Sequence, residues 1–274
     1  MPSSLIFQAF VTFVSELNFM PGISVVIITL NEERNIARCI KSVQGLADEV
    51  LVVDSHSTDR TCELAIGLGS RVISHDWQGY AATKNFANSQ AKYDHILSLD
   101  ADEALSDSLK QSILEIKERW PRDFYTMNRL TNYCGNWIRH CGWYPDRKLR
   151  LFNRNIGRWT GEIIHEVVTM DINTTSQHLK GDLLHYSYYS LADHIKQADR
   201  FTDLTAQEAY LKGKNSSRLK IFVAPKVKFI RDFFFNLGFL DGFYGYTVCR
   251  ISALATWLKY KKLRQLHFDK QKSL

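Results

Sequence analysis

The sequence is poor in several residue patterns that would place it in a specialised class of protein. It has five cysteines in 274 residues, and no two of them are spaced as CxxC. An odd number without such pairs argues against a disulfide framework and a zinc ribbon, and it favours a reducing compartment. No uncharged apolar run reaches the roughly 18 residues of a transmembrane helix, so none is expected.

Common cofactor and metal motifs are absent as well. No GxGxxG follows a strand-like run and no GxxxxGK(S/T) occurs, which excludes a dinucleotide fingerprint and a P-loop. His165-Glu166 is followed by Val167–Thr169, which excludes the HExxH pattern of zinc proteases. The apolar stretch over residues 1–22 lacks a basic start and contains Glu16, so a signal peptide is not expected.

Acidic residues are scarce near the C-terminus. Residues 212–274 contain 14 basic and 3 acidic side chains, a net charge of +11, whereas residues 1–211 contain 21 basic and 26 acidic ones, a net charge of −5. A local basic block of this kind indicates a polyanionic surface as partner, with a solvated tail as the alternative.

Short apolar runs alternate with segments of helical pattern over residues 23–120. Alternation of this kind predicts a doubly wound, Rossmann-like and mostly parallel α/β sheet flanked by helices. After Pro121 the pattern becomes irregular. The expected strands are Ile23–Thr29, Glu49–Val53, Arg71–Ser74, His95–Leu99 and Lys148–Phe152, and the expected helices are 31–43, 57–66, 79–91, 106–120 and 191–212.

Polar clusters follow three of the expected strands. They are Asn31-Glu32-Glu33, Asp54 with Asp59, and Asp100-Ala101-Asp102-Glu103. Ligands of doubly wound sheets bind beyond the carboxyl ends of the strands. Carboxylates at i and i+2, as in Asp100 and Asp102, can share one Mg²⁺ or Mn²⁺ together with phosphate oxygens and water. The alternative is a pair of solvated turn residues or helix caps.

Three blocks of sequence together resemble the nucleotide-sugar half of family 2 glycosyltransferases. The blocks are SVVIITLNEE (Ser24–Glu33), VVDSHSTDRT (Val52–Thr61) and LSLDADE (Leu97–Glu103), and their order and spacing match. YPDRKLRLF (Tyr144–Phe152), GEIIHE (Gly161–Glu166) and GFLDG (Gly238–Gly242) are similar to bacterial members that build lipopolysaccharide core or related surface glycans.

The resemblance implies a fold and a division of the chain. The implied fold is of the GT-A type, and the composition of the C-terminal segment adds a helical part that associates with a membrane. Residues 1–22 would form an N-terminal extension, 23–120 the nucleotide-sugar-binding half, 121–211 the acceptor-binding half, and 212–274 a basic aromatic helical tail. The implied activity is transfer of a sugar, from a UDP-sugar in most relatives, to a lipid-linked or lipopolysaccharide-core acceptor.

The resemblance also implies a donor site. Thr29, Asn31 and Glu32 would line the base and ribose pocket, and Asp54 would bind the nucleobase. Asp100 and Asp102 would handle ribose, diphosphate and a divalent cation, Mg²⁺ or Mn²⁺.

Several basic side chains could complete this site. Lys84 could complement phosphate charge, with a solvated helix lysine as the alternative. His185 is placed to be a late metal ligand, with a core histidine as the alternative. Arg147 or Arg150, beside an expected strand, could pair with the diphosphate, because guanidinium matches phosphate oxygens bidentately.

The resemblance implies an inverting transfer, which needs one carboxylate as general base. Glu166 is the first choice, Glu162 is the alternative, and His165 could orient either or touch phosphate. A general base must lie within hydrogen-bond reach of the hydroxyl that it deprotonates. The competing interpretation is structural, with Glu166 capping a strand edge and His165 packed against Trp159.

The basic segment over residues 212–274 is also rich in aromatic side chains. Aromatics mixed with Lys and Arg are typical of an interfacial segment on an anionic leaflet, which predicts a cytoplasmic protein held at the inner face of the cell membrane. Nucleic-acid binding is the disfavoured rival, and a helical pair packed on the catalytic domain is the other alternative. The aromatic residues are Phe229, Phe233, Phe234, Phe235, Phe239, Phe243, Tyr244 and Tyr246.

Two other functional classes remain open from the sequence. A phosphohydrolase of the haloacid dehalogenase type would also have an Asp-x-Asp motif after a strand. That family places its nucleophile on the first strand with Thr or Val at the fifth motif position, where this chain has Ala104. The third class is a non-catalytic module that binds glycans or nucleotides.

Overall fold

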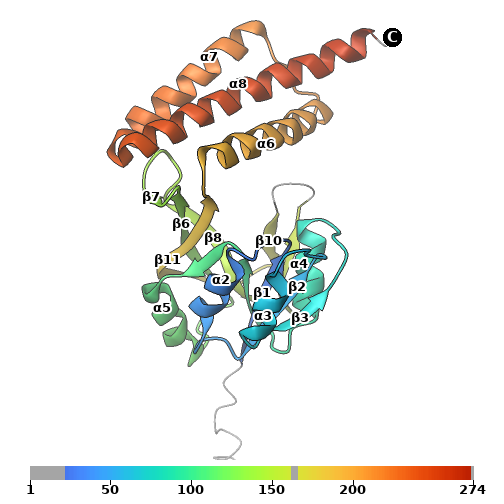
Figure 1. Cartoon of the computed structure of the whole chain (residues 1–274), viewed down its shortest axis with the longest axis vertical. Coiled ribbons are helices and arrows are strands. Elements are labelled where there is room, and N and C mark those ends of the chain that lie inside the picture. Colours follow the sequence, from blue (N-terminus) through green and yellow to red (C-terminus); the bar gives the residue numbers. More distant parts are fainter. Residues whose placement is uncertain (1–21, 162–165, 273–274) are drawn as a thin grey trace, which may run out of the picture.

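The computed structural model describes residues 22–161 and 166–272. The extension expected over residues 1–22 lies outside this part of the chain, apart from Gly22. Figure 1 shows an α/β region with a separate layer of helices beside it. No helix in the described ranges is both long and apolar enough to span a membrane.

Nine strands of the described residues form one mixed sheet in the order β3-β2-β1-β4-β8-β6-β11-β5, with β7 paired to β6. The first half of the order is parallel, as predicted, whereas β8 pairs antiparallel to both β4 and β6. Two further strands, β9 and β10, form a separate ribbon. The strands are β1 Ile23–Thr29, β2 Glu49–Asp54, β3 Arg71–Ser74, β4 His95–Asp100, β5 Glu103–Leu105, β6 Phe124–Tyr133, β7 Asn136–Ile138, β8 Asp146–Asn153, β9 Gly157–Thr160, β10 Val167–Met170 and β11 Ser176–Tyr188.

Strand β1 is buried along its whole length because both faces of the sheet are covered around it. Side chains alternate between the faces of a strand. Val25 and Ile27 accordingly pack with Ile40 of helix α2 (Ile36–Val43), and Val26 packs with Ala87 of α4 (Tyr80–Ser89). The continuous apolar run thus explains the central position of β1.

The expected helices of the first half are confirmed, with shifted starts. Helix α3 covers Thr61–Gly67 and α5 covers Asp107–Lys117, with Ser106 accepting a hydrogen bond from Leu109 at its N-cap. The prediction that Asn31 begins a helix is wrong. Asn31 has a left-handed backbone (φ 55°), and the helix begins at Ile36.

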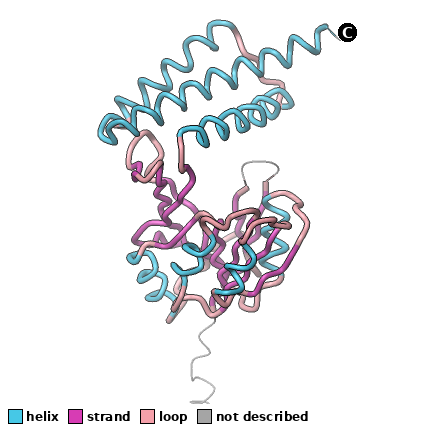
Figure 2. Tube along the Cα trace, in the orientation of Figure 1, coloured by secondary structure: helices cyan, strands magenta, loops and turns pink. Residues whose placement is uncertain are grey.

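The C-terminal layer consists of helices stacked on the end of the sheet (Figures 1 and 2). Helix α8 packs against both α6 and α7. Tyr133, Ile138 and Cys141 pack with Val248 and Cys249 of α8 and join the layer to the sheet. The helical elements are α6 Leu191–Leu211, α7 Arg218–Ile230, the π-helical turn η1 Arg231–Phe235, the 3₁₀ turn η2 Gly238–Asp241 and α8 Gly242–Lys272.

Candidate active site

The polar clusters predicted from the sequence meet at one edge of the sheet. Thr29 pairs in register with Asp54 on β2, and Ile28 pairs with Asp100 on β4. The three parallel strands therefore end side by side. The side chains that follow them share the crevice expected for a ligand of an α/β sheet.

The loops after β1 and β2 are joined by hydrogen bonds. The Asn31 carboxamide oxygen accepts from the Thr58 amide at 2.8 Å, and the Glu32 amide donates to the Thr61 hydroxyl at 2.8 Å. Asp54 accepts a bond of 2.8 Å from the amide of Ser57. These bonds hold the loops in a fixed arrangement and explain why Asn31 is a loop residue rather than a cap.

Two polar groups in this crevice have unusual environments. The Thr29 hydroxyl is buried and has no hydrogen-bond partner among the described residues, which makes it available to a ligand. Burial raises the pKa of the Glu32 carboxyl, and Asp102, Asp59 and Asp100 raise it further, although Asn35 donates a hydrogen bond of 2.7 Å to it.

Asp100 lies between two cations. The Lys84 ammonium is 2.9 Å from one of its oxygens, and the Arg150 guanidinium is 2.7 Å from the other. Burial alone would raise the pKa of Asp100, but Arg150 and Lys84 outweigh it and hold the pKa well below its usual range. Arg150 also pairs with Glu103 at 2.7 Å, so this carboxylate fixes the guanidinium from behind.

Lys84 is a buried residue of the site. It is 1% exposed, and its ammonium also lies 3.3 Å from Glu166 and 4.4 Å from the centre of the Trp159 ring. The alternative of a solvated helix lysine is therefore wrong. One cation links the end of β4 to the start of β10.

Asp102 contacts His185 across the sheet. Nε2 of His185 lies 3.1 Å from a carboxylate oxygen of Asp102, and its Nδ1 is 3.5 Å from the Thr131 hydroxyl. Burial would raise the pKa of Asp102, but His185 lowers it on balance. His185 therefore lies at the edge of the acidic cluster.

The two arginines considered for the diphosphate lie in different surroundings. Arg150 is buried against Asp100, whereas Arg147 is exposed, and it lies near enough to His178 to contribute, after burial, to a lowered pKa of that imidazole. The structure therefore brings Arg150, and not Arg147, to the carboxylates.

The expected general base lies at the same crevice. Glu166 immediately precedes β10 and pairs with Lys84. Glu162 and His165 lie outside the described residues.

Sequence reasoning missed Tyr80 and Trp77. Burial raises the pKa of the Tyr80 phenol, Arg200 of α6 opposes this, and Glu166 and the two Asp-x-Asp carboxylates raise it further, so Tyr80 lies beside the acidic cluster. Trp77 stacks edge-on against Tyr80 at 4.7 Å between ring centres. Their position at the start of the expected helix at 79–91, Trp77 just before it and Tyr80 in its first turn, was the available signal.

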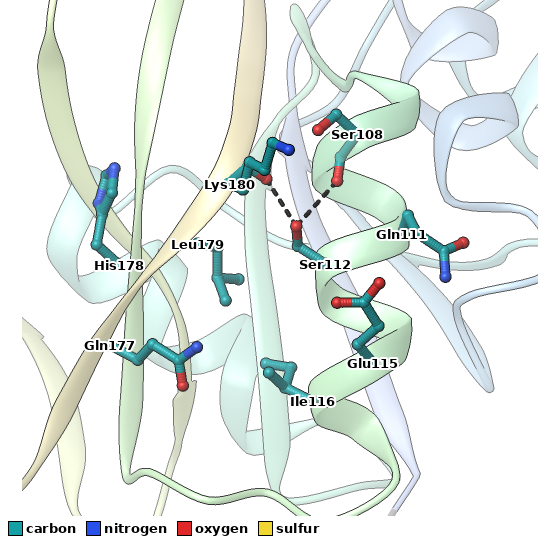
Figure 3. A pocket seen from close by; sticks show the side chains of 9 residues that line it. All are labelled: Ser108, Gln111, Ser112, Glu115, Ile116, Gln177, His178, Leu179 and Lys180. Carbon is teal, nitrogen blue, oxygen red and sulfur yellow. Dashed lines mark hydrogen bonds between the residues drawn. The ribbon is translucent and has the colours of Figure 1, made fainter.

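A different hollow lies between α5 and β11 (Figure 3). There the Ser112 hydroxyl donates to the carbonyls of Ser108 and Lys180. Its β11 residues, 177–180, lie near the opposite end of that strand from His185. This hollow contains none of the predicted site residues, so it is not the candidate active site.

Comparison with known proteins agrees with the geometry. An uncharacterized glycosyltransferase of Rickettsia typhi is 34% identical over 257 residues, which cover 90% of this chain and 88% of that protein. The lipopolysaccharide core biosynthesis glycosyltransferase LpsC of Rhizobium meliloti is 28% identical over 257 residues, 89% of this chain and 93% of LpsC.

Among solved structures, glucosyl-3-phosphoglycerate synthase of Mycobacterium tuberculosis, crystallised with Mn²⁺, UDP and glucosyl-3-phosphoglycerate, aligns with a TM-score of 0.35 and 26% identity. That alignment covers 41% of this chain and 44% of the synthase.

The family model described as glycosyl transferase family 2 matches residues 24–170, which include Asp54, the Asp-x-Asp motif, Glu166 and all of β1 but its first residue. The phosphohydrolase alternative is thereby set aside, and the GT-A-type fold class is confirmed. This chain belongs to glycosyl transferase family 2.

Proposed function

We propose that the protein transfers a sugar, with inversion, from a uridine diphosphate sugar to a hydroxyl group of a glycolipid or lipopolysaccharide-core acceptor. The observation that carries the proposal is the cluster at the strand ends, where Lys84 and Arg150 converge on Asp100 and His185 pairs with Asp102. Charges of both signs at one crevice suit a substrate that carries both a sugar and a diphosphate. The 28% identity with LpsC supports the acceptor class.

Asp102 and His185 fit a divalent cation. No group of three or more His, Cys, Asp or Glu side chains is arranged for a metal within the described ranges. Mg²⁺ and Mn²⁺ need few protein ligands when phosphate oxygens and water supply the rest. One carboxylate and one imidazole, 3.1 Å apart, are such a set. A cation bound there would supply Lewis-acid charge to the leaving diphosphate.

The remaining steps use side chains of this chain. The acceptor hydroxyl attacks the anomeric carbon, its proton passes to Glu166, and the bond from that carbon to the diphosphate oxygen breaks with its electron pair on the oxygen. Lys84 and Arg150 lie at the same cluster and stabilise the developing negative charge. Arg147, exposed on β8, is left as a contact for the outer part of the donor. Glu162 stays the alternative base, with His165 as its orienting residue.

The donor side of the proposal rests on the joined loops after β1 and β2. Thr29 has a free hydroxyl, Asn31 and Glu32 lie on the first loop, and Asp54 lies at the end of β2. We assign the base and ribose to these four side chains. Their fixed positions reduce the ordering cost of binding a nucleotide.

The test is release of nucleoside diphosphate from a panel of nucleotide sugars with Mn²⁺ or Mg²⁺, with a lipopolysaccharide-core acceptor. We expect turnover with a uridine donor, loss of turnover on chelation, and loss of cation-dependent donor binding in Asp102→Ala. Asp171→Asn is the matched control, because Asp171 is exposed on the turn between β10 and β11. If chelator leaves donor affinity unchanged in both the parent protein and Asp102→Ala, the metal assignment is overturned. Donor binding without turnover on any acceptor would favour a non-catalytic module.

A further inference from the structure

Helix α7 carries apolar side chains on a face that no other part of the described chain covers. Ile221 is the buried residue of this helix. Leu219, Val223, Val227 and Ile230 are exposed, and their spacing of three or four residues places them on one face. An amphipathic helix normally turns this face to the core, so its outward direction calls for a partner.

The exposed apolar surface continues around the turn into α8. Phe233 of η1 stacks edge-on with Phe239 of η2 and with Tyr246 of α8, at 6.2 and 6.0 Å between ring centres. Phe235 is 77% exposed and Phe243 is 67% exposed. We call this surface the apolar stripe. Its members are Leu219, Phe222, Val223, Val227, Ile230, Phe234, Phe235, Leu237, Phe239, Leu240, Phe243 and Tyr246.

The charges around the apolar stripe are one-sided. Residues 212–250 contain eight basic and two acidic residues. Both acidic side chains are turned inward: Asp232 is buried with Lys228 and Arg231, and Asp241 accepts hydrogen bonds from the backbone amides of Arg139 and His140. Lys226, by contrast, is exposed on the apolar face of α7. The surface left to solvent is therefore apolar and cationic.

We infer that the apolar stripe docks on the surface of an anionic phospholipid bilayer, with α7 lying in the interface. Exposed Leu, Val, Ile and Phe side chains would enter the acyl boundary, while lysine and arginine heads remain among the phosphates. A second copy of the chain fits this surface less well, because face-to-face contact would bring two cationic surfaces together. Nucleic acid fits less well because half of the stripe is aliphatic and offers no ring for stacking.

The inference is independent of turnover, so it can be tested without donor or acceptor. The full chain is floated with vesicles of phosphatidylcholine and of phosphatidylcholine mixed with phosphatidylglycerol. We expect the protein to bind the anionic vesicles. This binding should weaken as salt screens the charges, but some binding should persist at high salt because of the apolar contacts. Neutral vesicles should bind far less.

Variants separate the two contributions. Phe235→Ser with Phe243→Ser should lower the partition coefficient at least about tenfold, since each ring loses apolar burial. Lys226→Gln should lower it about fivefold on anionic vesicles. The controls are Ile172→Ser and Lys180→Gln, which change an exposed apolar and an exposed basic residue of the α/β region and should leave binding unchanged.

Circular dichroism and thermal melting establish that each variant is folded. Absence of binding by the folded parent protein, or equal binding of parent and double-serine variant, would overturn the inference. Conversion of a dimer to a monomer by the double-serine variant, with vesicle binding intact, would assign the stripe to a second copy. If the parent protein binds an oligonucleotide and the double-serine variant loses this binding while it keeps vesicle binding, the apolar stripe would be assigned to nucleic acid.

Discussion

The α/β region and the helical layer place charge in opposite ways. At the strand ends of the α/β region, acidic and basic side chains are gathered into linked, partly buried ion pairs around Asp100. In residues 212–250 of the helical layer, basic residues outnumber acidic ones, and the two acidic side chains, Asp232 and Asp241, are turned inward. Phenylalanine follows the same division, because the helical layer exposes it and the sheet buries Phe152.

The difference corresponds to the partners proposed for the two regions. The cluster around Asp100 is held by neighbouring side chains before any ligand binds, as electrostatic stabilisation of a transition state requires. The exposed cationic and apolar side chains of α7, η1, η2 and the start of α8 instead suit a surface without fixed positions, such as a lipid leaflet.

The largest expected effect tests the linked ion pairs. Lys84→Ala should destabilise the protein by about 3–5 kcal/mol, because it leaves Asp100 and Glu166 without their shared buried cation. Turnover should fall with it. Chemical denaturation gives the free energy of unfolding. A loss as small as that of a surface lysine would show that the cluster is not prearranged.

The junction between the two regions should make stability depend on pH. Burial lowers the pKa of His194, at the start of α6, to about 4. Its usual pKa is about 6.5, so the unfolded chain takes up a proton first as pH falls. The contribution of neutral His194 to the free energy of unfolding is therefore fully present above about pH 6.5. It declines as pH falls towards about 4, by at most about 3 kcal/mol.

The carboxylates have the same sign of pH dependence as His194, because stability again falls as pH falls, but their window lies at lower pH. Asp100 and Asp102 have lowered pKa values in the folded state, so their contribution is present above about pH 4 and is lost only as pH falls below that value. The assignment of the window between pH 6.5 and 4 to His194 is checked by unfolding curves of the parent protein and of His194→Gln across that window. An unchanged slope between pH 6.5 and 4 in His194→Gln would contradict it.

The smallest expected effect comes from an ion pair in the helical layer. Lys262 of α8 pairs with Asp199 and Asp203 of α6 at 2.7 and 2.8 Å, but it is 24% exposed and both carboxylates are more exposed still. Lys262→Ala should therefore cost only about 0–1 kcal/mol. Denaturation alongside Lys84→Ala makes the comparison direct, and similar losses for the two lysines would remove the distinction between the regions.

Strand positions and the polar strand ends could be predicted because they depend on local pattern. The run Ile23–Thr29 alternates between two covered faces, and parallel strands end at a common edge, so Asp54 and Asp100 were expected together. The start of the helix after β1 was mispredicted because the left-handed Asn31 hydrogen bonds to a loop that is distant in sequence.

The contacts of individual basic side chains could not be predicted. Arg147 and Arg150 lie three positions apart on β8, and the register of this strand shifts between Leu149 and Leu151, so side-chain alternation alone does not say which arginine reaches the carboxylates. Lys84 has the pattern of a surface helix residue, and only the packing of α4 on the end of β4 shows it to be buried. Spacing predicts an apolar face on α7 but not the direction in which that face points.

The most direct test of the proposed mechanism is to measure the steady-state kinetics of Glu166→Gln with donor, cation and acceptor. The substitution keeps the size and hydrogen bonding of the side chain but removes its ability to accept the proton. We predict that the rate falls by about 10²–10⁴ while donor affinity stays unchanged. Turnover equal to that of the parent protein, with loss of turnover in Glu162→Gln instead, would contradict the assignment of Glu166 and move the base to the neighbouring carboxylate.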